Sequence, residues 1–99
     1  PEAEGCRHSR WLSCFVVDES EFGMSCYDLI RFLETKNVES RPVWRPMHLQ
    51  PLYQGCEMIG GEVAERLNRT GICLPSSSSM TEAEQDFVIG LIRSVGNHE

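Results

Sequence analysis

Lysine is nearly absent from this sequence, and so are the patterns of membrane-spanning and nucleic-acid-binding proteins. Among 99 residues there are nine Lys or Arg and fifteen Asp or Glu, a formal net charge of −6, and Lys36 is the only lysine. This acidic balance argues against a nucleic acid or an anionic membrane as the main partner. No apolar run approaches the ~18 residues of a membrane span, and no signal peptide is visible. Because the sequence starts at Pro1 rather than Met, we expect it to be part of a longer chain.

Closely spaced cysteines are also missing. No two of the five cysteines stand in the C-x-x-C spacing that zinc sites and redox dithiols favour. We therefore expect free thiols and a reducing, cytoplasmic environment. Cys14, Cys26 and Cys73 lie in apolar segments and are expected to be small buried side chains. Cys6 and Cys56 lie in polar stretches and are expected to be exposed.

The first half of the sequence predicts a strand, a helix and an extended segment. Residues 11–17 (WLSCFVV) are apolar and rich in aromatic and β-branched residues, which predicts a strand buried on both faces or nearly so. Ser25 is a helix cap, and the apolar residues that follow it recur at helical spacing as far as Leu33. Residues 38–44 are extended, and Pro42 restricts them to a sheet edge or to a strand that runs into a loop.

The second half predicts two helices around a short strand. Residues 62–68 form a helix whose apolar face is Val63, Ala64 and Leu67, with Gly71 as its left-handed C-terminal residue. Residues 72–74 form the strand. Thr81 and Glu84 form a capping box for the last helix, whose apolar face comprises Phe87, Val88, Leu91, Ile92 and Val95. Three strands and three helices in this order indicate a small two-layer α+β domain, with helices on one face of the sheet and the other face open to a partner.

The loop of residues 41–50 carries the most chemistry. Arg41 offers a planar fork for phosphate or carboxylate, Trp44 offers a stacking face, and His48 and Gln50 can hydrogen-bond to hydroxyl groups. Such a loop can hold a sugar or a nucleotide. The alternative is that Trp44 packs on the core, Arg41 pairs with a surface acid and His48 is a satisfied polar residue. A cysteine-dependent site made of Cys56 and His48 is a third, unsupported possibility.

At this loop the sequence resembles a known family. Residues 37–51 (NVESRPVWRPMHLQP) are similar to a segment of the DegT/DnrJ/EryC1/StrS family of sugar aminotransferases. Residues 9–18 (SRWLSCFVVD), residues 60–81 (GGEVAERLNRTGICLPSSSSMT) and the last helix resemble further segments in the same order. The resemblance covers residues 9–95 and is limited to the family's small C-terminal domain, an antiparallel sheet of three or four strands with helices on one side. It implies a disordered lead-in at residues 1–8, this domain at residues 9–96 and a tail at residues 97–99.

The resemblance also implies a function for the parent protein. The family uses pyridoxal phosphate to transfer an amino group, usually from glutamate, to a keto sugar carried on a nucleotide, as in surface-polysaccharide or secondary-metabolite sugar biosynthesis. The cofactor forms a Schiff base with a lysine of the large N-terminal domain, which Lys36 does not match. No cofactor is therefore expected in this chain, which should be inactive alone. Its expected partners are the missing large domain, the nucleotide sugar and a second copy of the parent.

Within the loop, the resemblance implies a substrate-facing role for His48 most readily, and then for Trp44, Arg41 and Gln50. Two positions depart from the family pattern. Ser77 stands where the family commonly has Gly, which puts the usual loop conformation in doubt, and Arg45 stands where relatives often have Lys, which keeps the charge. The main alternative is a free-standing, non-enzymatic module that binds a ligand or a protein.

Overall fold

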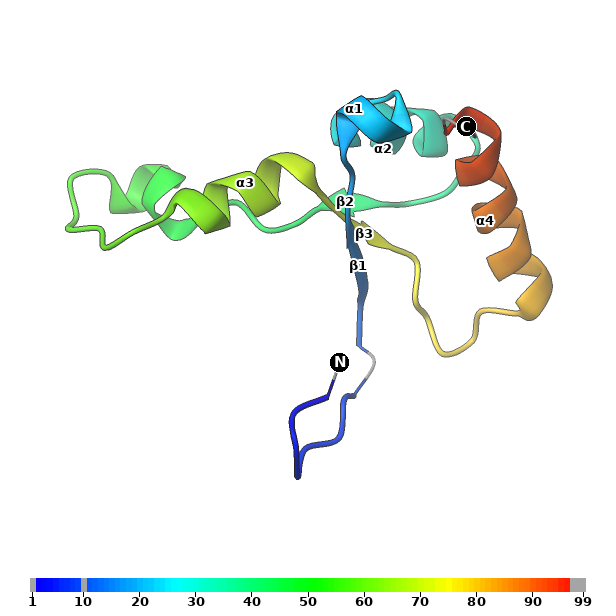
Figure 1. The fold of residues 1–99 in the computed structure, drawn as a ribbon, viewed down its shortest axis with the longest axis horizontal. Coiled ribbons are helices and arrows are strands. Elements are labelled where there is room, and N and C mark those ends of the chain that lie inside the picture. Colours follow the sequence, from blue (N-terminus) through cyan, green and yellow to red (C-terminus); the bar gives the residue numbers. More distant parts are fainter. Residues whose placement is uncertain (1, 10, 97–99) are drawn as a thin grey trace.

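The structure is a computed structural model that describes residues 2–9 and 11–96. A small sheet lies at its centre, with strands in the order β1 (Ser13–Val16), β3 (Gly71–Leu74) and β2 (Arg41–Pro42), each antiparallel to its neighbour (Figure 1). The predicted α+β class with an antiparallel sheet is confirmed. The helical elements are α1 (Glu19–Phe22), α2 (Cys26–Thr35), the 3₁₀ turns η1 (Met47–Leu49) and η2 (Pro51–Tyr53), α3 (Glu62–Thr70) and α4 (Glu82–Val95).

The register of the sheet explains how it tolerates Pro42. The backbone N–H of Val43 donates to the carbonyl of Gly71 at 3.1 Å, and Pro42 stands directly opposite Ile72. Because hydrogen-bonded and non-hydrogen-bonded pairs alternate along an antiparallel ladder, Pro42 occupies a non-hydrogen-bonded position. Its missing N–H therefore removes no ladder bond, and β2 lies at an edge as the proline predicts.

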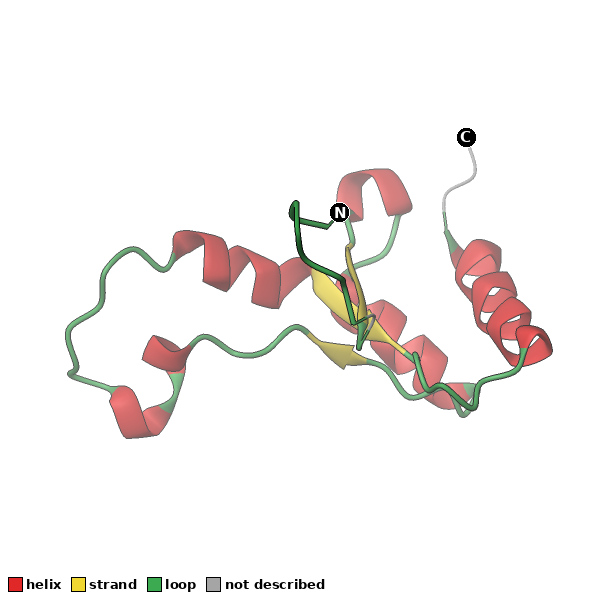
Figure 2. Cartoon of the chain, turned by 90° about the horizontal axis from the view of Figure 1, so that it is seen from below, coloured by secondary structure: helices red, strands yellow, loops and turns green. Residues whose placement is uncertain are grey.

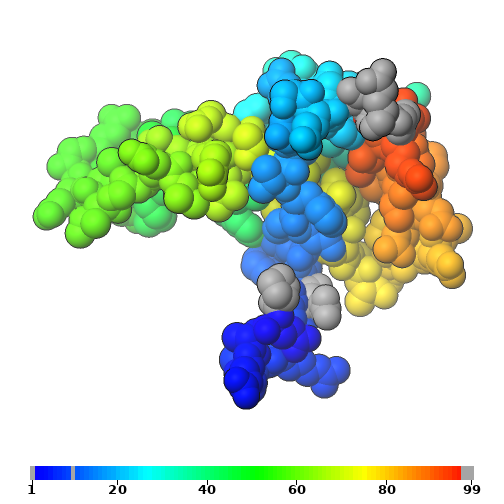
Figure 3. Space-filling model, viewed as in Figure 1, coloured from blue at the N-terminus to red at the C-terminus, as the bar shows by residue number. Residues whose placement is uncertain are grey.

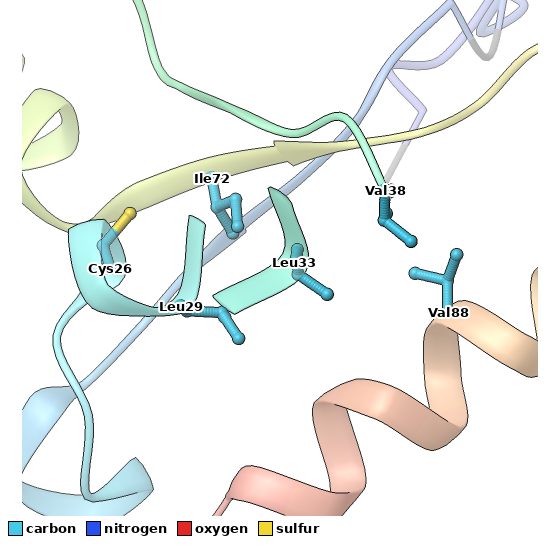
Figure 4. Packing of buried hydrophobic residues seen from close by; sticks show 6 residues of the cluster. All are labelled: Cys26, Leu29, Leu33, Val38, Ile72 and Val88. Carbon is cyan, nitrogen blue, oxygen red and sulfur yellow. The ribbon is translucent and has the colours of Figure 1, made fainter. Parts of the chain in front are cut away.

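The core is built from one face of α2 and the central strand. Cys26, Leu29 and Leu33 lie at helical spacing on α2 and pack beneath Ile72 of β3 (Figure 4). Ser25 caps the helix as predicted, since its hydroxyl accepts the backbone N–H of Asp28 at 3.2 Å. Val38 and Val88 point toward each other and complete the set of six buried apolar side chains in the described chain. Apart from these six residues, only partly buried apolar side chains pack against this small core in the described chain.

The predicted burial of β1 is wrong. Cys14 is exposed, and the side chains of Phe15 and Val16 are 56% and 62% exposed. The strand lies at a sheet edge, and the described part of this chain supplies no layer that covers it. The strand is also shorter than the predicted residues 11–17, and Asp18 caps the short helix α1, which the sequence did not predict. The carboxylate of Asp18 accepts the backbone N–H of Ser20 at 3.0 Å, and its bond from the Ser20 hydroxyl is the main reason that the pKa of Asp18 is lowered.

Residues 44–70 extend away from the sheet as an arm that contains η1, η2 and α3 (left in Figures 1 and 3; Figure 2 shows it from below). The predicted apolar face of α3 is not buried: Val63 and Ala64 are exposed. The arm is attached through Asn68, whose side-chain amide donates to the carbonyl of Val43 at 2.6 Å and whose carbonyl accepts the Tyr27 hydroxyl at 3.3 Å. The radius of gyration is 15.8 Å, against about 13 Å for a compact domain of this length. The chain therefore leaves much apolar surface for something else to cover.

Gly71 has a different role from the predicted one. Its φ of −90° and ψ of 141° are extended, so the helix does not end on a left-handed glycine. A Cβ at this position would lie 2.5 Å from the carbonyl oxygen of Leu67 and 2.5 Å from Cγ2 of Val43. Glycine is needed here because the last turn of α3 and Val43, which follows β2, lie too close to this position for any side chain.

The last helix forms largely as predicted. Thr81 accepts the backbone N–H of Glu84 at 3.1 Å, and its hydroxyl donates to the Glu84 carboxylate at 3.0 Å. Val88 is buried, whereas Phe87, also predicted to be buried, is 55% exposed. The predicted tail at residues 97–99 lies outside the described residues, and residues 2–9 contain no helix or strand. Across the described residues, no helix combines the length and the apolar content that crossing a membrane requires.

Candidate functional site

An open groove of about 940 Å³ lies between the β2 edge of the sheet and α4. Arg41 and Trp44, two of the four predicted site residues, line it. The opposite wall includes Phe87, Val88 and the acidic Glu84, while Ser76 and other residues of the loop after β3 contribute hydroxyl groups. The groove thus combines a cation, an aromatic face and hydroxyl groups within one concave surface.

Arg41 reaches the groove from the edge strand β2. Its Nε and Nη2 donate to one carboxylate oxygen of Glu39 at 3.0 and 2.7 Å. Both side chains are about three-quarters exposed, 77% and 75%, and exposed pairs of this kind contribute at most ~1 kcal/mol. The pair matches the alternative prediction that Arg41 meets a surface acid. It is also weak enough for a phosphate or carboxylate ligand to take the place of Glu39.

The alternative prediction that Trp44 packs on the core is wrong. The side chain is 62% exposed, and its ring centroid lies 5.9 Å from that of Trp11 at an interplanar angle of 35°. Trp11 also lines the groove. The two indoles therefore form one exposed aromatic surface beside Arg41.

His48 and Gln50 lie apart from this groove, in the arm. His48 Nε2 lies 2.8 Å from Oε1 of Glu65, and the two side chains are 19% and 35% exposed. The imidazole packs against Gly61, where φ is 111° and a Cβ would lie 2.9 Å from His48 Cε1. The Gln50 amide donates to the carbonyl of Arg45 at 3.2 Å and so stabilises the loop. The predicted set is therefore divided between the groove and the arm.

Glu65 is the site residue that the sequence analysis missed. A carboxylate that holds one imidazole nitrogen fixes the ring and leaves the other nitrogen to face a ligand. The only signal in the sequence is an acidic residue in the first turn of the helix after Gly60-Gly61, and it gives no indication of a contact with His48. The described contacts include no hydrogen bond between His48 and Cys56, which leaves the cysteine-dependent alternative without support.

Lys36 is the only lysine with which pyridoxal phosphate could form a Schiff base in this chain. Lys36 follows the last turn of α2, exposed, with its Nζ 5.9 Å from the ring centroid of Phe32. It does not line the groove. Within the described ranges, no group of three or more His, Cys, Asp or Glu residues could hold a metal ion.

Comparison with known proteins gives these features a context. The profile of the DegT/DnrJ/EryC1/StrS aminotransferase family matches residues 1–93. The chain belongs to this family. The family depends on pyridoxal phosphate, and the resemblance noted in the sequence is confirmed.

Several relatives show how much of such a protein the chain represents. It is 41% identical over 96 residues to EpsN of Bacillus subtilis (strain 168), provisionally named a pyridoxal phosphate-dependent aminotransferase, with 93% of this chain and 24% of EpsN covered. It is 30% identical over 97 residues to GDP-perosamine synthase of Vibrio cholerae, with 97% of this chain and 26% of that protein covered. Among solved structures, the aminotransferase TlmJ of Streptoalloteichus hindustanus shares the fold, with a TM-score of 0.77 at 24% identity over 95% of this chain and 24% of TlmJ. The chain thus spans about a quarter of the length of these relatives.

Proposed function

We propose that this chain is the small C-terminal domain of an aminotransferase that transfers an amino group, from glutamate, to a keto sugar carried on a nucleotide. Its similarity to GDP-perosamine synthase supports a nucleotide-sugar substrate. The observation that carries the proposal is the groove, where an arginine and exposed indoles line one concave surface in a member of this family.

The residues of the proposed site bind different parts of the nucleotide sugar. The Arg41 guanidinium binds a phosphate of the nucleotide sugar in exchange for Glu39. Trp44 stacks on a ring of the ligand and, with Trp11, excludes water from it. His48, held by Glu65, and Gln50 hydrogen-bond to sugar hydroxyls from the arm. Because the arm is separate from the groove, we place His48 and Gln50 at the other end of the ligand or at the active site of a second parent subunit.

The cofactor is proposed to bind elsewhere in the parent protein. When bound there, pyridoxal phosphate supplies the carbonyl group that accepts and passes on the amino group. Lys36 takes no part, because it lies outside the groove. The residues of this chain bind and orient the sugar nucleotide, and the chain alone has no aminotransferase activity.

A pair of arginine variants tests the assignment of Arg41. Arg41→Gln in the parent enzyme should raise the Kd of the nucleotide sugar about 10- to 100-fold, because hydrogen bonds to charged groups contribute ~1.5–3 kcal/mol. Arg31→Gln is the matched control, since Arg31 is 78% exposed and also pairs with an acid, Asp28, at 3.3 Å on α2. Equal effects of the two substitutions, measured by isothermal titration calorimetry, would contradict the assignment.

A free-standing binding module is the second candidate, because Arg41, Trp44 and Trp11 lie on the groove of this chain without help from another. Calorimetry of the chain with GDP-, UDP- and dTDP-sugars distinguishes the two. Weak binding is expected of part of a pocket, whereas tight binding by this chain alone would favour the module. A borohydride-stable adduct of pyridoxal phosphate on Lys36 would contradict the proposal that the cofactor binds elsewhere.

A further inference from the structure

Two cysteines that are 59 positions apart in the sequence meet across the sheet. Cys14 of β1 stands directly opposite Cys73 of β3, and their Sγ atoms are 3.2 Å apart. Both are free thiols. The sequence predicts two separate buried side chains, but Cys14 is exposed and Cys73 is only half-buried.

The register places the two cysteines at a position where a covalent bond can form. The backbone N–H of Val17 donates to the carbonyl of Thr70 at 2.7 Å, so these two residues are a hydrogen-bonded pair of the same ladder. Hydrogen-bonded and non-hydrogen-bonded pairs alternate along an antiparallel ladder, and Cys14 and Cys73 lie three positions from Val17 and Thr70. They are therefore a non-hydrogen-bonded pair, in which the Cα atoms are expected to be ~4.5 Å apart and the side chains close. That separation lies within the range of about 4.4–6.8 Å found in disulfides.

The other thiols differ in their surroundings. The Cys26 thiol is buried and donates to the carbonyl of Gly71 at 3.1 Å, which removes it from exchange with solvent. Cys6 and Cys56 are exposed, as predicted, but lie on the N-terminal segment and on the arm. Only Cys14 and Cys73 among the described cysteines have sulfur atoms in contact.

We propose that Cys14 and Cys73 are a reversible dithiol–disulfide site that exchanges with low-molecular-weight disulfides such as oxidised glutathione. The proposal concerns the 99-residue chain itself, in which Cys14 is exposed, and it is tested apart from the function proposed above. A disulfide here would join β1 to the central strand, and Cys73 lines the groove beside Arg41.

The exchange takes two balanced steps. The Cys14 thiolate attacks one sulfur of the small disulfide, which breaks that S–S bond, forms a mixed disulfide on Cys14 and releases one thiolate. Cys73 then loses its proton to solvent and attacks the Cys14 sulfur, which forms the Cys14–Cys73 bond and releases the second thiolate. The two cysteines lose two electrons and two protons, and the small disulfide is reduced to two thiols.

The surroundings of the two thiols set the order of attack. Cys14 is exposed and can meet a small disulfide in solution. Burial, and then the contact with Cys14, raises the pKa of Cys73 to about 11. Cys73 is therefore almost wholly protonated at neutral pH, and it takes the second, intramolecular step, in which its neighbour is already 3.2 Å away.

The test is oxidation of the native, full chain by a graded ratio of oxidised to reduced glutathione, followed by alkylation and mass spectrometry. Alkylation at both Cys14 and Cys73 should be lost together, a peptide that links the two should appear, and dithiothreitol should reverse both changes. Cys14→Ser should abolish the link and leave Cys73 alkylated. The control Cys56→Ser, which removes an exposed thiol on the arm, should leave the link intact.

The same oxidation in a denaturant separates the native pairing from chance. Five cysteines allow ten pairings, so the unfolded chain should distribute its links over several of them. A native chain that forms mixed disulfides on Cys14 without closing the link to Cys73 would overturn the proposal. So would native oxidation that yields the same mixture of links as the unfolded chain.

Discussion

Gly71→Ala should destabilise the chain although the backbone of Gly71 adopts ordinary extended angles. The added Cβ would lie 2.5 Å from two atoms, the carbonyl oxygen of Leu67 and Cγ2 of Val43. Overpacking costs ~1–3 kcal/mol when side chains can yield, and here one of the two atoms belongs to the backbone. The carbonyl of Gly71 also accepts hydrogen bonds from the Val43 N–H and the Cys26 thiol, both at 3.1 Å, and a shift of the strand would weaken them.

We therefore expect the free energy of unfolding to fall by about 2–3 kcal/mol. A chain of this length has a stability near the low end of ~5–15 kcal/mol. At ~4–8 °C per kcal/mol, Tm should fall by about 8–24 °C. Urea unfolding followed by circular dichroism measures the free energy, and a thermal scan measures Tm.

Gly90→Ala is the matched control, because it adds the same methyl group in the interior of α4 with nothing within 4 Å. Alanine is the better helix former, so this variant should be more stable by ~0.5–1 kcal/mol. The two variants should thus change stability in opposite directions. The reasoning is refuted if the free energy of unfolding of Gly71→Ala lies within ~0.5 kcal/mol of that of the unmodified chain. It is also refuted if Gly90→Ala is the more destabilised of the two.

Three further predictions concern the cap, the core and the titration of a thiol. Ser25→Ala removes the acceptor for the Asp28 N–H and should lower the free energy of unfolding by about 1 kcal/mol in urea. Leu33→Ala should lower it by ~2.7–5 kcal/mol, because Leu33 is fully buried; the control Leu52→Ala, at a site 80% exposed, should change it by less than ~0.5 kcal/mol. The raised pKa of Cys73 stabilises the fold below the ordinary thiol pKa of 9.0, and this contribution is lost as the pH rises through about 11. Urea unfolding between pH 8 and pH 11 should therefore show a loss of stability that Cys73→Ser lacks, and parallel curves for the two proteins would contradict this.

Local signals in the sequence were sufficient for α2, α3 and α4, but not for the four-residue helix α1. The Ser25 cap, the apolar spacing that follows it and the Thr81 capping box all depend on residues within one or two turns of each other. Such contacts form wherever the local sequence permits them. The limits of α4 and the edge position of β2 could be predicted for this reason, and the family resemblance rested on continuous runs of residues.

Burial could not be predicted in the same way. Apolar content marks residues 11–17 and the α3 face as surfaces that avoid water, but it does not say which layer covers them. In this chain neither is covered, and Ile59 of the arm is 93% exposed. Because the chain spans about a quarter of the length of its relatives, it lacks the further segments that could cover such surfaces in a longer protein.

The candidate site was predictable by residue type but not by arrangement. One continuous loop suggested one binding surface, yet the backbone turns through η1 and η2 and carries His48 away from Arg41. The contacts that matter most join distant positions: His48 to Glu65, and Cys14 to Cys73. Such pairs depend on the packing of the arm and on strand register, and a register shift of one residue would reverse the faces of every side chain on a strand.

The register of β3 connects the core, the groove and the thiol pair. In the observed register, Ile72 faces α2, whereas Cys73 lies opposite both Cys14 and Arg41. At Gly71, the first residue of β3, Leu67 and Val43 leave no room for a Cβ. If Gly71→Ala displaces the strand, it should weaken the Cys14–Cys73 link under oxidation as well as lower Tm, because both depend on the same alignment. Gly90→Ala should leave the link unchanged. If Gly71→Ala lowers the stability but leaves the link intact, the register is fixed by something other than Gly71.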